Sequence, residues 1–131
     1  MANAFNIEDA KALIPWLQET FDALQPLIAR LDNLTQERYL KAQEMRSDGG
    51  AEAEEILSKT EEDRREVEQA IRKLLDPIMA IGILVKDIRR GLFDFPFLRE
   101  GTIVNLCWQA GEPELMYWHT LEDGFDGRQP L

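Results

Sequence analysis

The chain has 131 residues, 44% hydrophobic and 31% charged, which is typical of a folded globular protein rather than a disordered or membrane-embedded one. Its 25 acidic and 15 basic residues give a net charge of −10, which opposes binding to nucleic-acid phosphates. The single cysteine, Cys107, excludes an intrachain disulfide and favours a reducing, cytoplasmic location, and no apolar run approaches the ~20 residues of a membrane span.

The first 81 residues carry a heptad pattern that predicts two long helices packed against each other. The predicted seam positions alternate in fours and threes: Ala10, Ile14, Leu17, Phe21, Leu24, Ile28 and Leu31, then Ile56, Thr60, Asp63, Val67, Ile71, Leu74, Ile78 and Ile81. Asn6 is placed to cap the first helix, the sequence from Ser47 to Gly50 predicts the turn, and Gly82 is placed to end the second helix. Pro15 and Pro26 predict kinks, or a short first helix followed by a longer one.

The far end of this predicted hairpin differs in composition from its base. Residues 36–66 contain ten acidic and six basic residues, and the seam there carries Thr60 and Asp63 in place of large apolar side chains. Such a segment is either a solvated helix tip or an acidic surface for a protein partner.

From Gly82 onward the hydrophobic period changes from 3.5 to two, which is typical of β-strands. The predicted strands are Ile83–Ile88, Leu92–Leu98, Thr102–Trp108 and Pro113–His119. They are joined by short glycine-containing turns, which predicts an antiparallel meander with the strands in chain order. The expected fold class is α+β in one domain: a helical hairpin over residues 1–81, a four-stranded sheet over 82–121 and an irregular arm over 122–131.

The register of this predicted sheet depends on its turns, of which the first two read as three-residue connections ending in glycine. They place Lys86 opposite Asp94 and Asp94 near Leu106. Thr102 then lies opposite His119. In this register both faces of the sheet are apolar, and the helices are about 60 Å long while the strands are about 23 Å long. A second copy of the chain covers the excess surface most economically, so the sequence predicts a homodimer.

Several ordered motifs in the second half resemble a known family. They are Gly91-Leu92-Phe93-Asp94-Phe95-Pro96, Leu106-Cys107-Trp108, Gly111-Glu112, Trp118-His119, Gly124-Phe125 and Gly127-Arg128. Together with Glu8, Ala10, Leu13, Ile14 and Pro15 near the start, they make the chain similar to the bacterial domain-of-unknown-function family numbered 2203. The resemblance implies a small cytoplasmic prokaryotic protein and implies no activity.

His119 is the only histidine, so a metal or acid–base site has to include it. Glu122 and Asp123 follow three and four residues later, which makes a carboxylate–histidine metal site feasible if the chain turns after the last strand. The alternative is a structural histidine at a strand end, hydrogen-bonded to Thr102 or to the arm.

Four other polar residues are considered for a site, two of them with open alternatives. Asp94 is either paired with Lys86 or an acid in a pocket. Glu112 lies about 23 Å from His119 along an extended strand, so the two do not share a metal within one chain. Cys107 is expected to be a buried, inert thiol. Arg128 either clamps an anionic ligand or docks the acidic arm onto Asp94 or Glu112 through an ion pair.

Two functions remain open from the sequence, and no catalytic residue is identified. The first is a non-enzymatic homodimeric interaction or assembly module, with a protein partner at the hairpin tip. The second is a protein that binds a divalent metal or a small anion, and functions as a metal-dependent hydrolase in one version, with His119 and nearby carboxylates in its site.

Overall fold

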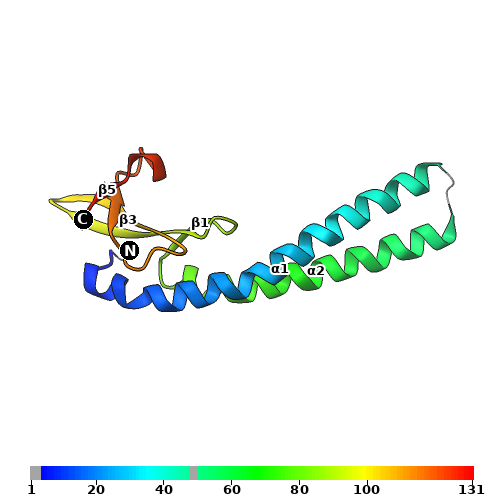
Figure 1. Cartoon of the computed structure of the whole chain (residues 1–131), viewed down its shortest axis with the longest axis horizontal. Coiled ribbons are helices and arrows are strands. Elements are labelled where there is room, and N and C mark those ends of the chain that lie inside the picture. The colour runs from blue at the N-terminus through cyan, green and yellow to red at the C-terminus, as the bar shows by residue number, and fades with distance from the viewer. Residues whose placement is uncertain (1–3, 48–49) are drawn as a thin grey trace. The chain divides into compact units, whose positions relative to one another are not determined.

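The computed structural model describes residues 4–47 and 50–131 and has the predicted α+β architecture (Figure 1). Two long helices form a hairpin and an antiparallel sheet follows. The elements are α1 (Ile7–Ser47), α2 (Ala51–Ala80), β1 (Leu84–Asp87), β2 (Leu92–Arg99), β3 (Thr102–Gln109), β4 (Tyr117–His119), the 3₁₀-helix η1 (Phe125–Gly127) and β5 (Gln129–Pro130).

The helix ends follow the predicted signals. The Asn6 side chain accepts a hydrogen bond of 2.7 Å from the backbone N–H of Asp9, which caps α1. Gly82 has a φ of 98° and donates its N–H to the Met79 carbonyl, which ends α2. α1 is one continuous helix, so the alternative of a short first helix is wrong. Asp48 and Gly49, in the predicted turn, lie outside the described residues.

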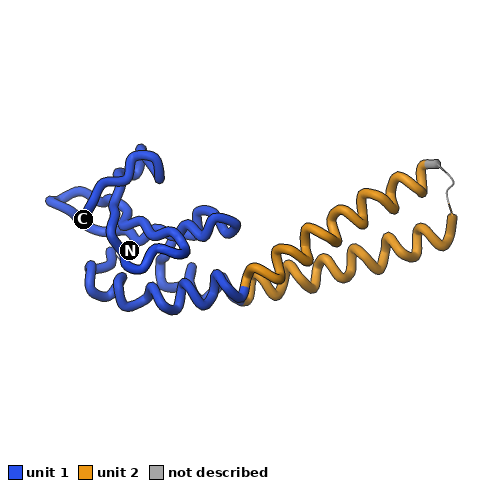
Figure 2. Tube along the Cα trace, in the orientation of Figure 1, with its two compact units in different colours: residues 1–23, 74–131 blue, residues 24–73 orange. Residues whose placement is uncertain are grey.

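The chain divides into two compact units, one of residues 1–23 and 74–131 and one of residues 24–73 (Figure 2). The second unit holds the outer part of the hairpin, where Arg38 pairs with Glu61 at 3.0 Å across the two helices. Most buried helix positions lie on the predicted seam: Ala10, Ile14, Leu17, Leu24 and Ile28 in α1 and Thr60, Val67, Ile71 and Ile78 in α2. Thr20 and Leu34 are buried off the seam, and the predicted seam residue Ile81 is exposed. The boundaries between the two units fall inside α1 and α2. The division into units therefore does not test the predicted single domain over residues 1–131, which stays a prediction.

The sheet has five antiparallel strands in the order β1-β2-β3-β4-β5, one more than predicted. The extra strand is β5, which pairs Gln129 with Trp118 and Pro130 with Tyr117. The arm that the sequence presented as irregular is therefore built into the sheet. β4 begins at Tyr117 instead of Pro113, because the connection after β3 is longer than a tight hairpin turn.

The turn between β2 and β3 decides which side chains share a face. Arg99 pairs directly with Thr102, leaving a two-residue loop of Glu100 and Gly101, with φ values of 51° and 81°. Positive φ at both central residues is typical of a type I′ turn. The predicted three-residue turn is one residue too long, and a slip of one residue moves every side chain of a strand to the opposite face.

In the observed register one face of the sheet is apolar and forms the main core. Phe93, Phe95 and Phe97 of β2 lie opposite Trp108, Leu106 and Val104 of β3. The first turns of α1 lie along this face (Figure 1). The buried cluster consists of Ala10, Ile14, Leu17, Ile78, Ile83, Phe93, Phe95, Val104, Leu106, Trp108, Leu115 and Trp118.

The opposite face is not the second apolar surface that the predicted register required. Asp94 lies opposite Cys107, and Asn105 lies opposite His119. The predicted apolar second face is therefore wrong, and the part of the dimer argument that rested on it is lost. The homodimer stays a prediction that rests on the length of the helices.

The β2–β3 turn yields a stability test. Gly101→Ala should lower the free energy of unfolding by about 1–2 kcal/mol, because an L side chain is strained at positive φ. An added Cβ at Gly101 meets no atom within 4 Å, so packing contributes nothing to this loss. Glu100→Asn should raise stability by a few tenths of a kcal/mol, since asparagine tolerates this conformation better.

Urea unfolding followed by circular dichroism measures both changes. Gly50→Ala is the matched control, because Gly50 also has open space around it and its φ lies outside the left-handed region. Equal effects of the alanine substitutions at Gly50 and Gly101 would contradict the assigned turn.

Candidate metal centre

Three side chains of different metal-ligating types meet on the polar face of the sheet. Asp94 comes from β2, Cys107 from β3 and His119 from β4. One ligand atom from each lies within 4.8 Å of the other two, and this is the one group of three such residues within the described part of the chain. All three are at most 3% exposed. Cys107 follows Asp94 by 13 residues in the sequence, and His119 follows Cys107 by 12. Antiparallel pairing of the three neighbouring strands brings these side chains together.

The hydrogen bonds of His119 orient its ring toward Asp94. Nδ1 lies 2.7 Å from the Thr120 carbonyl oxygen, and a carbonyl oxygen only accepts, so Nδ1 carries a hydrogen and donates it. Nε2 lies 3.0 Å from Asp94 Oδ2. Metal-bound histidines usually donate one ring N–H to a carbonyl or carboxylate and present the other nitrogen to the ion. His119 has this arrangement, with Nε2 directed into the cluster.

The spacing of the cluster suits a tetrahedral ion. Zinc lies about 2.0–2.3 Å from its nitrogen, oxygen and sulfur ligands, which places neighbouring ligand atoms roughly 3.3–3.7 Å apart. The separation of 3.0 Å between His119 Nε2 and Asp94 Oδ2 is close to this value. A small displacement of the two side chains would therefore suffice to admit an ion between them.

Asn105 adds a buried amide beside the three candidate ligands. Its Nδ2 donates to Asp94 Oδ2 at 3.4 Å, while its Oδ1 is buried and has no hydrogen-bond partner. The side chain is 3% exposed. Leaving an acceptor unpaired in the interior costs about 1–3 kcal/mol, so Oδ1 would gain from a bound group that donates a hydrogen bond.

The Cys107 thiol is buried and resists ionisation. Burial raises its pKa to about 12 from an ordinary value near 9, and the negative charge of Asp94 contributes to the rise. As predicted from the sequence, this free cysteine is buried, and the raised pKa disfavours a nucleophilic role. Metal binding would have to displace its proton, because the thiolate is the ligand.

The cluster forms the floor of a cavity of about 190 Å³. The cavity is lined by Lys86, Leu92, Asp94, Asn105, Cys107, His119, Leu121, Gly124 and Phe125. The floor residues from β2, β3 and β4 are buried, whereas Lys86 and Leu121 are exposed and mark its open end. Gly124 and Phe125 belong to the C-terminal arm, so the arm supplies one wall.

Arg128 holds this arm in place. Its Nη2 donates to both carboxylate oxygens of Glu112, at 2.6 and 2.8 Å, and to the Cys107 carbonyl at 3.3 Å. The guanidinium carbon lies 4.1 Å from the centroid of the Tyr117 ring and 4.6 Å from that of Phe125. Of the two docking partners left open by the sequence, Glu112 is the one that Arg128 contacts.

The structure places the other sequence candidates apart from the cluster. Glu122 and Asp123 are exposed and do not form a group of ligand atoms with His119. Lys86 is not opposite Asp94, because Leu84 occupies that position and the β1–β2 register is irregular between Val85 and Asp87. The partners of Asp94 are His119 and Asn105.

The sequence analysis did not place Cys107 or Asn105 in the candidate metal site. Asn105 and Cys107 are two residues apart, so a strand places their side chains on the same face, and Asp94 lies in the preceding strand. Predicting that Asp94 shares this face requires knowing that the turn between the two strands has two residues. A three-residue turn places Asp94 near Leu106 instead and separates it from Cys107.

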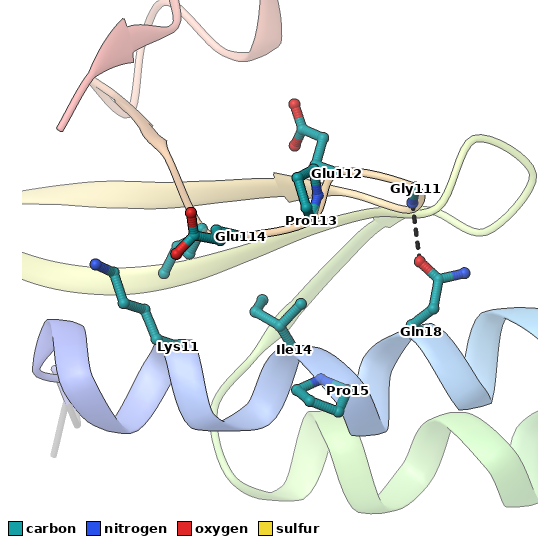
Figure 3. Close-up of a pocket in the computed structure, with 9 residues that line it drawn as sticks. Lys11, Ile14, Pro15, Gln18, Gly111, Glu112, Pro113 and Glu114 are labelled. Carbon is teal, nitrogen blue, oxygen red and sulfur yellow. Dashed lines mark hydrogen bonds between the residues drawn. The ribbon is translucent and has the colours of Figure 1, made fainter.

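A second cavity of about 390 Å³ lies between α1 and the loop after β3 (Figure 3). Lys11 and Glu114 lie toward one end of it, and the Gly111 N–H donates to Gln18 Oε1 at 2.9 Å at the other. Ile14 lines its helix side. This cavity contains no cluster of metal-ligating side chains, so it is the weaker candidate site within the described residues.

Comparison with known proteins identifies the family. The model of the family described as "Uncharacterized conserved protein (DUF2203)" matches residues 3–131, so the chain belongs to this family. No curated protein and no solved structure gave a match. Within the described residues, no helix combines the length and apolar character needed to cross a membrane.

The Arg128 contacts predict a measurable loss of stability. Arg128→Ala should lower the free energy of unfolding by about 2–3 kcal/mol, since it leaves the largely buried Glu112 carboxylate without its cation. Arg128→Lys should cost less, because it keeps the charge and loses the planar stacking between the two rings.

Chemical denaturation measures both variants against the parent protein. Arg99→Ala is a suitable control, because the ion pair of Arg99 with Glu100 is exposed. A loss at Arg128 no larger than at Arg99 would contradict the role of this contact.

Proposed function

We propose that this protein binds a transition-metal ion, with zinc as the preferred ion, through Asp94, Cys107 and His119. The observation that carries the proposal is the convergence of three buried ligand atoms within 4.8 Å. A thiolate with an imidazole favours zinc over magnesium or calcium, which prefer oxygen ligands. Three protein ligands are typical of zinc sites that keep a fourth position for water or substrate.

The charge of the candidate ligands also favours a divalent ion such as zinc. A carboxylate and a thiolate together supply two negative charges, which a divalent ion neutralises in the low-dielectric interior. The reducing cytoplasmic location expected from the sequence would keep the thiol available as a ligand.

Metal titration tests the proposal. Purified protein should bind one Co²⁺ or Zn²⁺ per chain, and the Co²⁺ form should show the charge-transfer absorption of a thiolate–metal bond. Cys107→Ser should abolish this absorption, and His119→Ala should weaken binding well over tenfold, since even outer-shell partners of metal sites are worth about ten- to a hundredfold.

Glu122→Gln and Asp123→Asn are the matched controls, because they remove the carboxylates that the sequence suggested. Both variants should bind the ion like the parent protein. Loss of binding in these variants with normal binding in Cys107→Ser would favour the sequence-predicted ligand set instead. No stoichiometric binding to the parent protein would refute a metal centre.

The raised thiol pKa predicts how affinity depends on pH. Because burial raises the pKa of the Cys107 thiol to about 12, the thiol is protonated at neutral pH and a bound ion displaces its proton. Zinc affinity should therefore rise at least about tenfold per pH unit between pH 6 and 8. Chelator competition at several pH values measures the slope, and Cys107→Ser should reduce it by about one power of ten per unit. An unchanged slope would exclude the thiol as a ligand.

The homodimeric assembly module remains a second candidate, supported by exposed apolar side chains on the hairpin. Tyr39 and Leu40 are 63% and 54% exposed on α1. Tyr39 lines a groove of about 760 Å³ together with Met45 and Leu57. Large exposed apolar side chains beside a groove are typical of protein interaction surfaces.

Light scattering at micromolar concentration tests this candidate. The parent protein should have twice the mass of one 15.1 kDa chain, and Tyr39→Ser with Leu40→Ser should shift it toward the monomer. A monomeric parent protein would refute the homodimer.

A further inference from the structure

We propose that the fourth coordination position of the metal centre opens into the 190 Å³ cavity and binds a small hydroxylated carboxylate there, with Lys86 and Asn105 as its recognition residues. This inference rests on the metal centre proposed above. It goes beyond that centre because it specifies the size, charge and hydrogen-bonding groups of the ligand.

The cavity volume sets the size of the ligand. An apolar cavity of about 150 Å³ holds a benzene molecule, so 190 Å³ accommodates roughly six to eight non-hydrogen atoms. The buried floor and the exposed Lys86 and Leu121 give the cavity one closed and one open end. A small molecule entering past Lys86 would reach the three candidate ligands at the floor.

The charges around the cavity favour a monoanion. A divalent ion with one carboxylate, one thiolate and one neutral imidazole has no net charge. Lys86 then leaves the cavity with one positive charge. The irregularity of the β1–β2 pairing lies at Lys86, between Val85 and Asp87. Bulges of this kind commonly redirect a side chain beside a functional site.

The Asn105 Oδ1, which no described residue pairs, favours a ligand that carries a hydrogen-bond donor. Asn105 lines the cavity and is 3% exposed, and its Nδ2 is already engaged with Asp94. Oδ1 can only accept, so it selects a ligand that carries an O–H or N–H group. A carboxylate for Lys86 and the metal, together with a hydroxyl for Asn105, satisfies both requirements in a small molecule.

Spectroscopy of the Co²⁺-loaded full chain tests the inference, with glycolate and acetate as probes. Glycolate should change the visible absorption bands of the ion at millimolar concentration, and should bind about fivefold or more tightly than acetate, which lacks the hydroxyl group. Asn105→Ala should remove this preference. Lys86→Met should weaken glycolate binding about fivefold or more while leaving Co²⁺ affinity unchanged, as expected for loss of a partly exposed ion pair.

Lys73→Met is the matched control, because Lys73 is also exposed, does not line the cavity and carries the same charge. It should leave glycolate binding unchanged. The anion site is refuted if Co²⁺ binds with the thiolate absorption but glycolate leaves the visible bands unaltered. It is also refuted if Lys86→Met and Lys73→Met have the same effect on glycolate binding. In either case the metal centre stands. If Co²⁺ does not bind, both proposals fall.

Discussion

The pairing of β2 with β3 is the constraint on which the rest of this structure depends. Side chains alternate between the two faces of a sheet, so the register of this pair decides which residues are buried in the core and which face outward. With Asp94 opposite Cys107, three phenylalanines share the core face with Trp108, and the polar residues gather on the other face. The Glu100–Gly101 turn sets that register through positive φ at two consecutive residues. One more residue in the turn would separate Asp94 from Cys107 and put part of the polar cluster into the core.

The polar cluster is retained because its members stabilise one another. An ionisable side chain in the interior is costly unless it is paired, and the paired groups here come from three different strands. His119 Nδ1 donates to the Thr120 carbonyl, its Nε2 lies 3.0 Å from Asp94 Oδ2, and Asp94 also accepts from Asn105. The C-terminal arm then forms a wall beside the cluster and is fastened by Arg128 to Glu112. The same backbone pairing that builds the core thus assembles a site with one unpaired acceptor and one unreactive thiol.

The helical part of the fold could be predicted from sequence because its signals are local. A heptad seam, the Asn6 cap and Gly82 each act within one or two helical turns, and the buried seam positions follow the pattern. For Arg128 the sequence left open an anionic ligand, Asp94 and Glu112, and the structure shows the contact with Glu112. The proposed ligand set was harder to predict, because it depends on pairing between strands. Glu122 and Asp123 are near His119 in sequence, whereas Asp94 and Cys107 reach the ring only through the sheet.

By itself, the sequence determined the α+β class, the long hairpin, the strand order of the first four strands and the membership of the family. These depend on hydrophobic period, glycine placement and motif order, all of which are written along the chain. Only the tertiary structure decided the faces of the sheet, the fifth strand and the meeting of Asp94, Cys107 and His119. The physical reason is that a sheet has a period of two. A difference of one residue in a turn leaves the apolar pattern of each strand intact and still exchanges its two faces.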